Sequence, residues 1–195
     1  MSEKSNSRES IVNTACRLFF SQGYHATGLS QIIKDSGTPK GSLYHYFPNG
    51  KEELVHECIH TMNEQIQKKI ERTFAAHSNS GEAILKFVLD LADDAEAAGF
   101  TGFLPFSQWS AVETSCISSE LRRDSQAVFT DWQNRIAKHL MLDGIHESKA
   151  KDLAMITISL MEGALVISLT HQNKQPLVTA AQYLSGMVNQ ARKES

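Results

Sequence analysis

Residues 56–60 read His-Glu-Cys-Ile-His, which is the H-E-x-x-H pattern of zinc proteases. On a helix its two histidines would lie one turn apart and bind zinc, and the glutamate between them would act as a general base. One extended form of the pattern fails, because Asn63 and Ile66 stand where a glycine and a further histidine are required. A more distant carboxylate, Glu82 or Glu96, stays open as a third ligand. We nevertheless predict no enzyme, no metal and no cofactor, because a protease also needs a strand to align its substrate and no strand pattern is visible.

A second group of polar residues, within the segment 38–47, suits a helix that reads DNA. The segment reads Thr-Pro-Lys-Gly-Ser-Leu-Tyr-His-Tyr-Phe, and it is too short to need all its polar groups for folding. A glycine such as Gly41 destabilises a helix by about 1 kcal/mol relative to alanine. A DNA backbone that approaches the helix closely at this position would explain why a glycine stands there. The side chains that can reach phosphates and base edges in a major groove are Lys40, Ser42, Tyr44 and His45.

Two short helices joined by a glycine-containing turn must position these side chains. The first is predicted over Leu29–Ser36 and is closed by Gly37. The second is predicted over Thr38–Phe47, with Thr38 as its N-cap and Pro39 in its first turn, where a missing N–H costs nothing. Packed on a preceding helix, such a pair makes a helix-turn-helix unit.

The remaining periodicity is also helical, so we predict an all-α fold. Apolar residues from Ile11 to Phe19 lie on one face of a first helix, and Gly23 suits a left-handed stop. Further helices are expected over Lys51–Ala76, Ile84–Leu91, Phe106–Ile117, Glu120–Leu142, Lys149–His171 and Pro176–Lys193. We expect an N-terminal three-helix helix-turn-helix domain over residues 1–50, and a C-terminal helical ligand-binding and dimerisation domain over residues 51–195.

Residues 26–48, which run from Ala-Thr-Gly-Leu-Ser to Tyr-His-Tyr-Phe-Pro, resemble the DNA-binding signature of the TetR family of bacterial regulators. Residues 15–24 resemble the first helix of that family, and the match covers about residues 8–60. The resemblance implies an N-terminal DNA-binding domain and a C-terminal domain for ligand and dimer contacts. It implies that DNA is faced by Thr27, Lys40, Ser42, Tyr44, His45 and Lys51, to which we add Thr38, Pro39 and Gly41 of the same segment.

Two departures from the family pattern stand out. Pro39 occupies a position where the family usually has serine, which moves the expected helix cap to Thr38. The run Phe-Pro-Asn-Gly-Lys, which ends at Lys51, is one residue longer than the commoner form. This insertion is similar to a subgroup related to lincomycin-resistance and flavonoid-responsive regulators.

Charge and cysteine content fit a soluble regulator. The net charge is −3, but residues 1–50 carry +2 and the remaining residues carry −5. A mildly basic N-terminal segment is therefore followed by an acidic C-terminal part, which is compatible with a small DNA-binding module. The three cysteines have no metal-binding spacing, and the polar N-terminus is no secretory signal, which together predict a cytoplasmic protein. The apolar stretch Leu153–Leu169 carries Glu162 mid-run, and we expect a core helix and no membrane span.

Aromatic residues gather around a break rich in glycine and phenylalanine, residues 99–105, and on the flanking helices. As a set they predict a largely apolar cavity for a small, planar aromatic or hydrophobic ligand. The predicted ligand-binding residues are Phe87, Phe103, Phe106, Trp109, Glu113, Phe129 and Trp132.

The last two helices predict a homodimer. Leu153–Leu169 is apolar on more than one face, so one face needs a partner, and Gly163 with Ala164 would allow close approach. A two-fold dimer presents two recognition helices to a pseudo-palindromic double-stranded DNA operator. The predicted function is a transcriptional repressor that a small-molecule effector releases from DNA. A metal-dependent enzyme and a helical binding protein without DNA are the alternatives.

Overall fold

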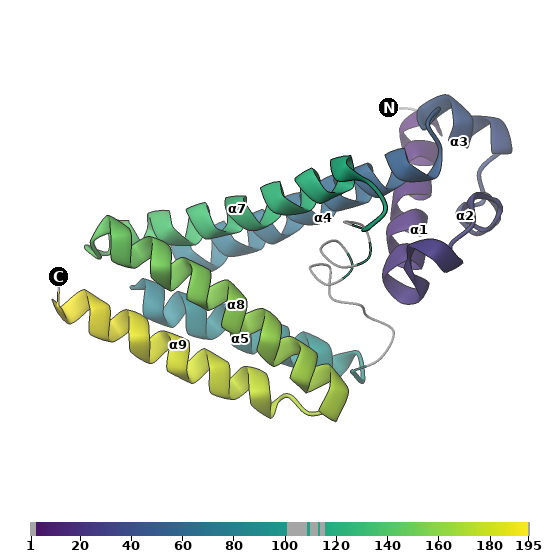
Figure 1. The fold of residues 1–195 in the computed structure, drawn as a ribbon. Coiled ribbons are helices and arrows are strands. Elements are labelled where there is room, and N and C mark those ends of the chain that lie inside the picture. Colours follow the sequence, from purple (N-terminus) through teal and green to yellow (C-terminus); the bar gives the residue numbers. More distant parts are fainter. Residues whose placement is uncertain (1–2, 101–108, 110–112, 114–115, 195) are drawn as a thin grey trace. The chain divides into compact units, whose positions relative to one another are not determined.

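The computed structural model describes residues 3–100, 109, 113 and 116–194. Within these ranges the regular elements are helices and no residue lies in a strand, which confirms the predicted all-α class (Figure 1). The helices are α1 (Glu3–Ala26), α2 (Leu29–Ser36), α3 (Lys40–Tyr46), α4 (Lys51–Ala75), α5 (Ser80–Ala97), α7 (Ser119–Leu142), α8 (Glu147–His171) and α9 (Gln175–Glu194). Most of the helix predicted over Phe106–Ile117 falls outside the described residues.

The chain divides into two compact units. Unit 1 comprises residues 1–64 and 102–127, and unit 2 comprises residues 65–101 and 128–195. The long helices α4 and α7 each contribute residues to both units. A domain boundary at residue 50 stays a prediction.

Unit 1 is built on α1, which packs against α2 and α3. Its apolar face buries Ile11 and Phe19 completely, together with Ile32 of α2 and Leu43 of α3. Gly23 was expected to end the first helix in a left-handed conformation, and this is wrong in detail. Gly23 has φ 84° and ψ 170°, so the chain kinks there and a further helical turn continues to Ala26.

Unit 2 contains α5, α8 and α9, with α9 packed along both of the others (Figure 1). The α5 helix begins at Ser80, earlier than expected, because the side chain of Asn79 accepts a hydrogen bond of 3.0 Å from the Glu82 N–H. At Gly81 a Cβ atom would come within 2.4 Å of the Asn189 side chain, which shows how closely α5 and α9 approach.

Helix α8 is apolar on nearly every side. Its mean hydropathy over the best 18 residues is 1.9, so by length and composition alone it could cross a membrane. One side of it is buried within unit 2, through residues that include Leu153, Ile158 and Leu165. The other side exposes Met155 and Ile167, among others, and needs a separate explanation.

Candidate nucleic-acid interface and ligand pocket

The turn between α2 and α3 is fixed by backbone geometry and two hydroxyls. Gly37 has a left-handed conformation with φ 67°, and its N–H donates to the Lys34 carbonyl, as expected for a helix stop. The prediction that Thr38 caps α3 is wrong. Pro39 stands at the cap position with no side-chain hydrogen bond, and the Thr38 hydroxyl lies 2.7 Å from that of Ser36.

Helix α3 has a buried side and an exposed side. Leu43 is fully buried and Phe47, just past the end of the helix, is 1% exposed, so these two residues anchor α3 in unit 1. Tyr44 is 45% exposed, and His45 beside it is also exposed. Lys40 is exposed too, with its ammonium 6.0 Å from the centre of the Tyr44 ring. The polar side chains expected to read DNA are therefore accessible in unit 1.

Other predicted DNA-binding residues at the start of α3 are also accessible. Pro39 and Gly41 are exposed, and Thr38 and Ser42 are half-buried. No described atom would lie within 4 Å of a Cβ atom at Gly41, so no packing within the described chain explains this glycine. Close approach to a DNA backbone stays a prediction for Gly41.

Thr27 does not have the exposure expected of a DNA contact. The residue is fully buried, and its hydroxyl donates a hydrogen bond of 2.7 Å to the Gly23 carbonyl. Its side chain therefore closes the turn after the kink in α1 and is not open to a phosphate.

Lys51, at the first position of α4, is half-buried. Its ammonium lies 4.0 Å from the centre of the Tyr24 ring, a cation–π contact. Burial lowers the pKa of Lys51 below its usual value, although the nearby Glu113 carboxylate acts in the opposite direction. A phosphate contact by Lys51 stays a prediction.

Two residues expected in the ligand cavity contact α1 in unit 1 instead. Trp109 is 1% exposed and packs against Phe19 and Phe20, with ring centres 5.7 and 5.0 Å away. Glu113 accepts a hydrogen bond of 2.7 Å from the N–H of Tyr24. Both residues therefore support α1 rather than line a pocket in unit 2. Phe103 and Phe106 lie outside the described residues.

Unit 2 contains an apolar hollow that includes two of the predicted residues. Phe87 and Trp132 line it, whereas Phe129 packs edge-on against Trp132, 5.6 Å between ring centres, and is not part of the lining. The space open to a water-sized sphere is about 20 Å³, which holds about one water molecule, so a ligand would have to widen this hollow on binding. The full lining is Ile66, Ile70, Phe74, Ile84, Phe87, Trp132, Ile136, Thr157, Ile158 and Met161. Most of these residues were missed, because periodicity shows that a helix face is buried but not that a space remains beneath it.

A polar network borders this hollow. The guanidinium of Arg135 donates to Glu71 and to Gln67, and His139 lies 3.1 Å from Glu71. His139 also stacks on Phe74, one of the lining residues, with ring centres 4.5 Å apart. Burial raises the pKa of Glu71, but hydrogen bonds from Arg135 and His139 outweigh it and lower that pKa overall. A charged carboxylate is thus held next to an apolar wall.

The H-E-x-x-H residues do not converge. His56 contacts Asp124, Glu57 pairs with Arg8 at 2.8 Å, and His60 is a largely exposed side chain near Glu64. Among the described residues, neither Glu57 nor His60 joins a group of potential metal ligands. The protease arrangement is therefore not assembled.

Comparisons with known proteins agree along nearly the whole chain. Residues 11–58 match the family described as bacterial regulatory proteins of the tetR family, and residues 80–183 match the LmrA/YxaF-like C-terminal domain of transcriptional regulators. The uncharacterized HTH-type regulator YxaF of Bacillus subtilis is 39% identical over 188 residues, which cover 96% of this chain and 98% of that protein. The HTH-type regulator LmrA of the same organism is 39% identical over 173 residues, or 89% of this chain and 92% of that protein. A crystal structure of a TetR regulator from Chloroflexus aurantiacus superposes with a TM-score of 0.83 at 25% identity, and the match covers 97% and 98% of the two chains.

Proposed function

Because the chain belongs to the TetR family and is a transcriptional regulator, we propose that it is a cytoplasmic, homodimeric repressor released from its operator by a small hydrophobic or aromatic ligand. The observation that supports DNA recognition most directly is that α3 has one buried side and one exposed polar side. Leu43 and Phe47 are buried, while Lys40, Tyr44 and His45 are exposed. A short helix anchored on one side and polar on the other suits insertion into a major groove.

The exposed side of α8 and the neighbouring side of α9 support the dimer. Large apolar residues are exposed there at helical spacing, namely Met155, Ile156, Leu160, Val166, Ile167, Tyr183 and Met187. Gly163 and Gly186 lie among them, and no described atom would meet a Cβ at either position. Exposed apolar residues in this number are typical of an interface, and a two-fold dimer would bury the same surface of both chains.

The hollow in unit 2 supports a ligand that acts on DNA binding. Three of its lining residues, Ile66, Ile70 and Phe74, lie on α4. The first part of that helix belongs to unit 1, directly after α3. A ligand that prefers one position of α4 would therefore favour one conformation of the DNA-binding unit. To move the protein from nearly all in the DNA-binding conformation to nearly all in the released one, the ligand must bind the released conformation about 5.5 kcal/mol more favourably.

The experiment is a gel-shift series with the full chain and the DNA that flanks its own gene. We expect a discrete shift that planar aromatic compounds reverse, with flavonoids as the first probes because of the subgroup resemblance. Phe87→Ala should weaken this reversal and leave DNA binding in place, since Phe87 lines the hollow. Phe129→Ala is the matched control outside the lining and should respond like the parent chain. A well-folded chain that retards none of this DNA would contradict the proposal.

A further inference from the structure

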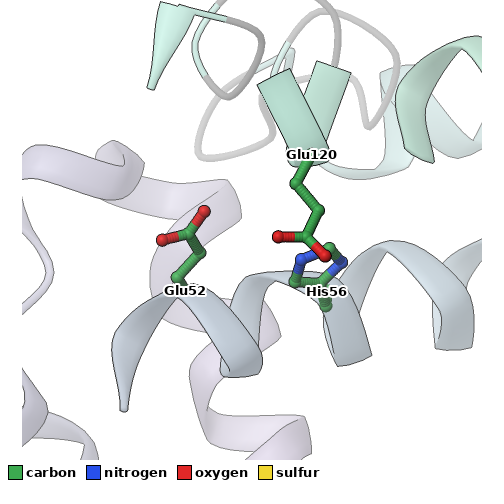
Figure 2. Close-up of side chains that lie close together, drawn as sticks. All are labelled: Glu52, His56 and Glu120. Atoms are coloured by element: carbon green, nitrogen blue, oxygen red, sulfur yellow. The ribbon is translucent and has the colours of Figure 1, made fainter. Parts of the chain in front are cut away.

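Four side chains with metal-binding chemistry lie together in unit 1, and none of them is a predicted DNA contact. Glu52 and His56 are one turn apart on α4, and Glu120 and Asp124 are one turn apart on α7. Two positions four residues apart lie on the same face of a helix. Each helix therefore directs a pair of potential ligands toward the other, as Figure 2 shows for Glu52, His56 and Glu120.

The donor atoms are close enough to share one ion. One ligand atom each from Glu52, His56 and Glu120 lies within 4.8 Å of the other two. Around a tetrahedral zinc ion, ligands bound at 2.0–2.2 Å stand about 3.4 Å from one another. Small rotations of the two glutamate side chains would close the remaining difference.

The imidazole of His56 is already held in place. Its Nδ1 contacts the Asp124 carboxylate across the two helices. A carboxylate on one ring nitrogen fixes the tautomer in which the other nitrogen carries the lone pair that a metal requires. His56 and Asp124 are each only about one-third exposed, so the pair is partly shielded from water.

The cluster also has an excess of negative charge. Three carboxylates surround one histidine, and no ion pair joins Glu52 or Glu120 to a lysine or arginine among the described residues. A divalent cation would offset this repulsion. Because one donor is an imidazole, the set suits zinc and similar transition metals better than Mg²⁺ or Ca²⁺, which prefer all-oxygen sites.

We propose that Glu52, His56 and Glu120 bind a divalent transition-metal ion, with zinc as the first candidate. Such an ion would tie the first two turns of α4 to the first turn of α7 inside unit 1. Glu52 directly follows Lys51, so the ion would fix the part of α4 that lies next to the DNA-binding segment. This assignment differs from the H-E-x-x-H interpretation, because it uses His56 without Glu57 or His60.

The test is zinc titration of the tag-free, chelator-treated full chain by calorimetry, with thermal unfolding as a second readout. We expect one zinc per chain, and at 100 times the dissociation constant a rise of about 5–10 °C in Tm. Glu120→Gln changes an exposed side chain, so the variant should fold normally and bind zinc at least about tenfold more weakly. His56→Ala should lose the site.

His60→Ala is the matched control, since His60 lies one turn further along α4 and is 72% exposed. It should bind zinc like the parent chain. Failure of the parent chain to bind zinc would overturn the proposal, and so would unchanged binding in both Glu120→Gln and His56→Ala. A loss in His60→Ala equal to that in His56→Ala would overturn it too, in favour of a site built on the H-E-x-x-H pair. None of these readouts requires DNA, so they stand apart from the proposed repressor function.

Discussion

At the scale of single residues, specific side-chain partners, one local and one distant in sequence, explain where Thr27 and Trp109 lie. Thr27 is a short polar residue in a connecting segment, which usually means exposure, yet its hydroxyl is used to close a turn onto Gly23. Trp109 was assigned to a ligand cavity because it stands among other aromatic residues in sequence. Its actual partners are Phe19 and Phe20, about ninety residues earlier, and no local pattern reveals such a contact.

Gly23 gives a residue-scale prediction on stability. Its φ of 84° and ψ of 170° belong to a region open almost only to glycine, and a Cβ atom there would lie 2.8 Å from Glu113 Oε1. Gly23→Ala should therefore lower the free energy of unfolding by about 1–3 kcal/mol in a urea titration. Gly28→Ala is the control, because Gly28 has negative φ and free space around it, and its effect should be the smaller one. Equal effects of the two changes would contradict the strain argument.

Lys40 gives a residue-scale prediction on electrostatics. If its exposed ammonium contacts a phosphate, Lys40→Ala removes one counterion-releasing contact from each half-site. The slope of log affinity against log salt concentration should then fall by about 1 per recognition helix, with no change in sequence preference. Lys138→Ala, which removes an exposed lysine from α7 in unit 2, should leave the slope unchanged. Fluorescence anisotropy at several salt concentrations measures both, and an unaltered slope for Lys40→Ala would exclude the phosphate contact.

At the scale of elements, the helices were predictable because amphipathic periodicity and turn residues are local properties. The α8 and α9 helices begin and end within two residues of the expected bounds, and Gly37 ends α2 as expected. The cap of α3 was not predictable from residue preference alone, because the Thr38 hydroxyl has a competing partner in Ser36. Likewise, the residue types of the segment 78–81 predict a loop, whereas the Asn79 cap starts α5 at Ser80.

Helix α8 gives the element-scale prediction. Ile167 is 48% exposed, so a charge there leaves the core of unit 2 unchanged but becomes buried and unpaired in a dimer. Ile167→Glu should raise the dimer dissociation constant at least about 100-fold, which corresponds to ~2.7 kcal/mol. Light scattering coupled to gel filtration, without detergent, should show a folded monomer. Leu142→Glu changes a leucine that is 74% exposed at the end of α7 and should stay dimeric. If Ile167→Glu dimerises with the same dissociation constant as the parent chain, the dimer interface does not include this side of α8.

At the scale of the whole molecule, the two units differ in how much of their function-related structure the sequence predicts. The helix-turn-helix part of unit 1 could be identified from sequence, because its turn and its exposed polar residues lie within one short segment. The hollow of unit 2 and the metal-type cluster of unit 1 could not, because each is assembled from helices that are distant in sequence. For the cluster, the sequence signal is a glutamate and a histidine four residues apart on α4, and a glutamate and an aspartate four residues apart on α7.

The central claim is that the exposed side of α3 recognises DNA, and Tyr44→Ala tests it most directly. Tyr44 is 45% exposed, so its truncation should leave unfolding and dimerisation unchanged. Anisotropy titration of the operator should show affinity at least about 100-fold weaker than that of the parent chain, as expected when a central recognition side chain is removed. A folded, dimeric Tyr44→Ala chain that binds the operator with the affinity of the parent chain would contradict the account.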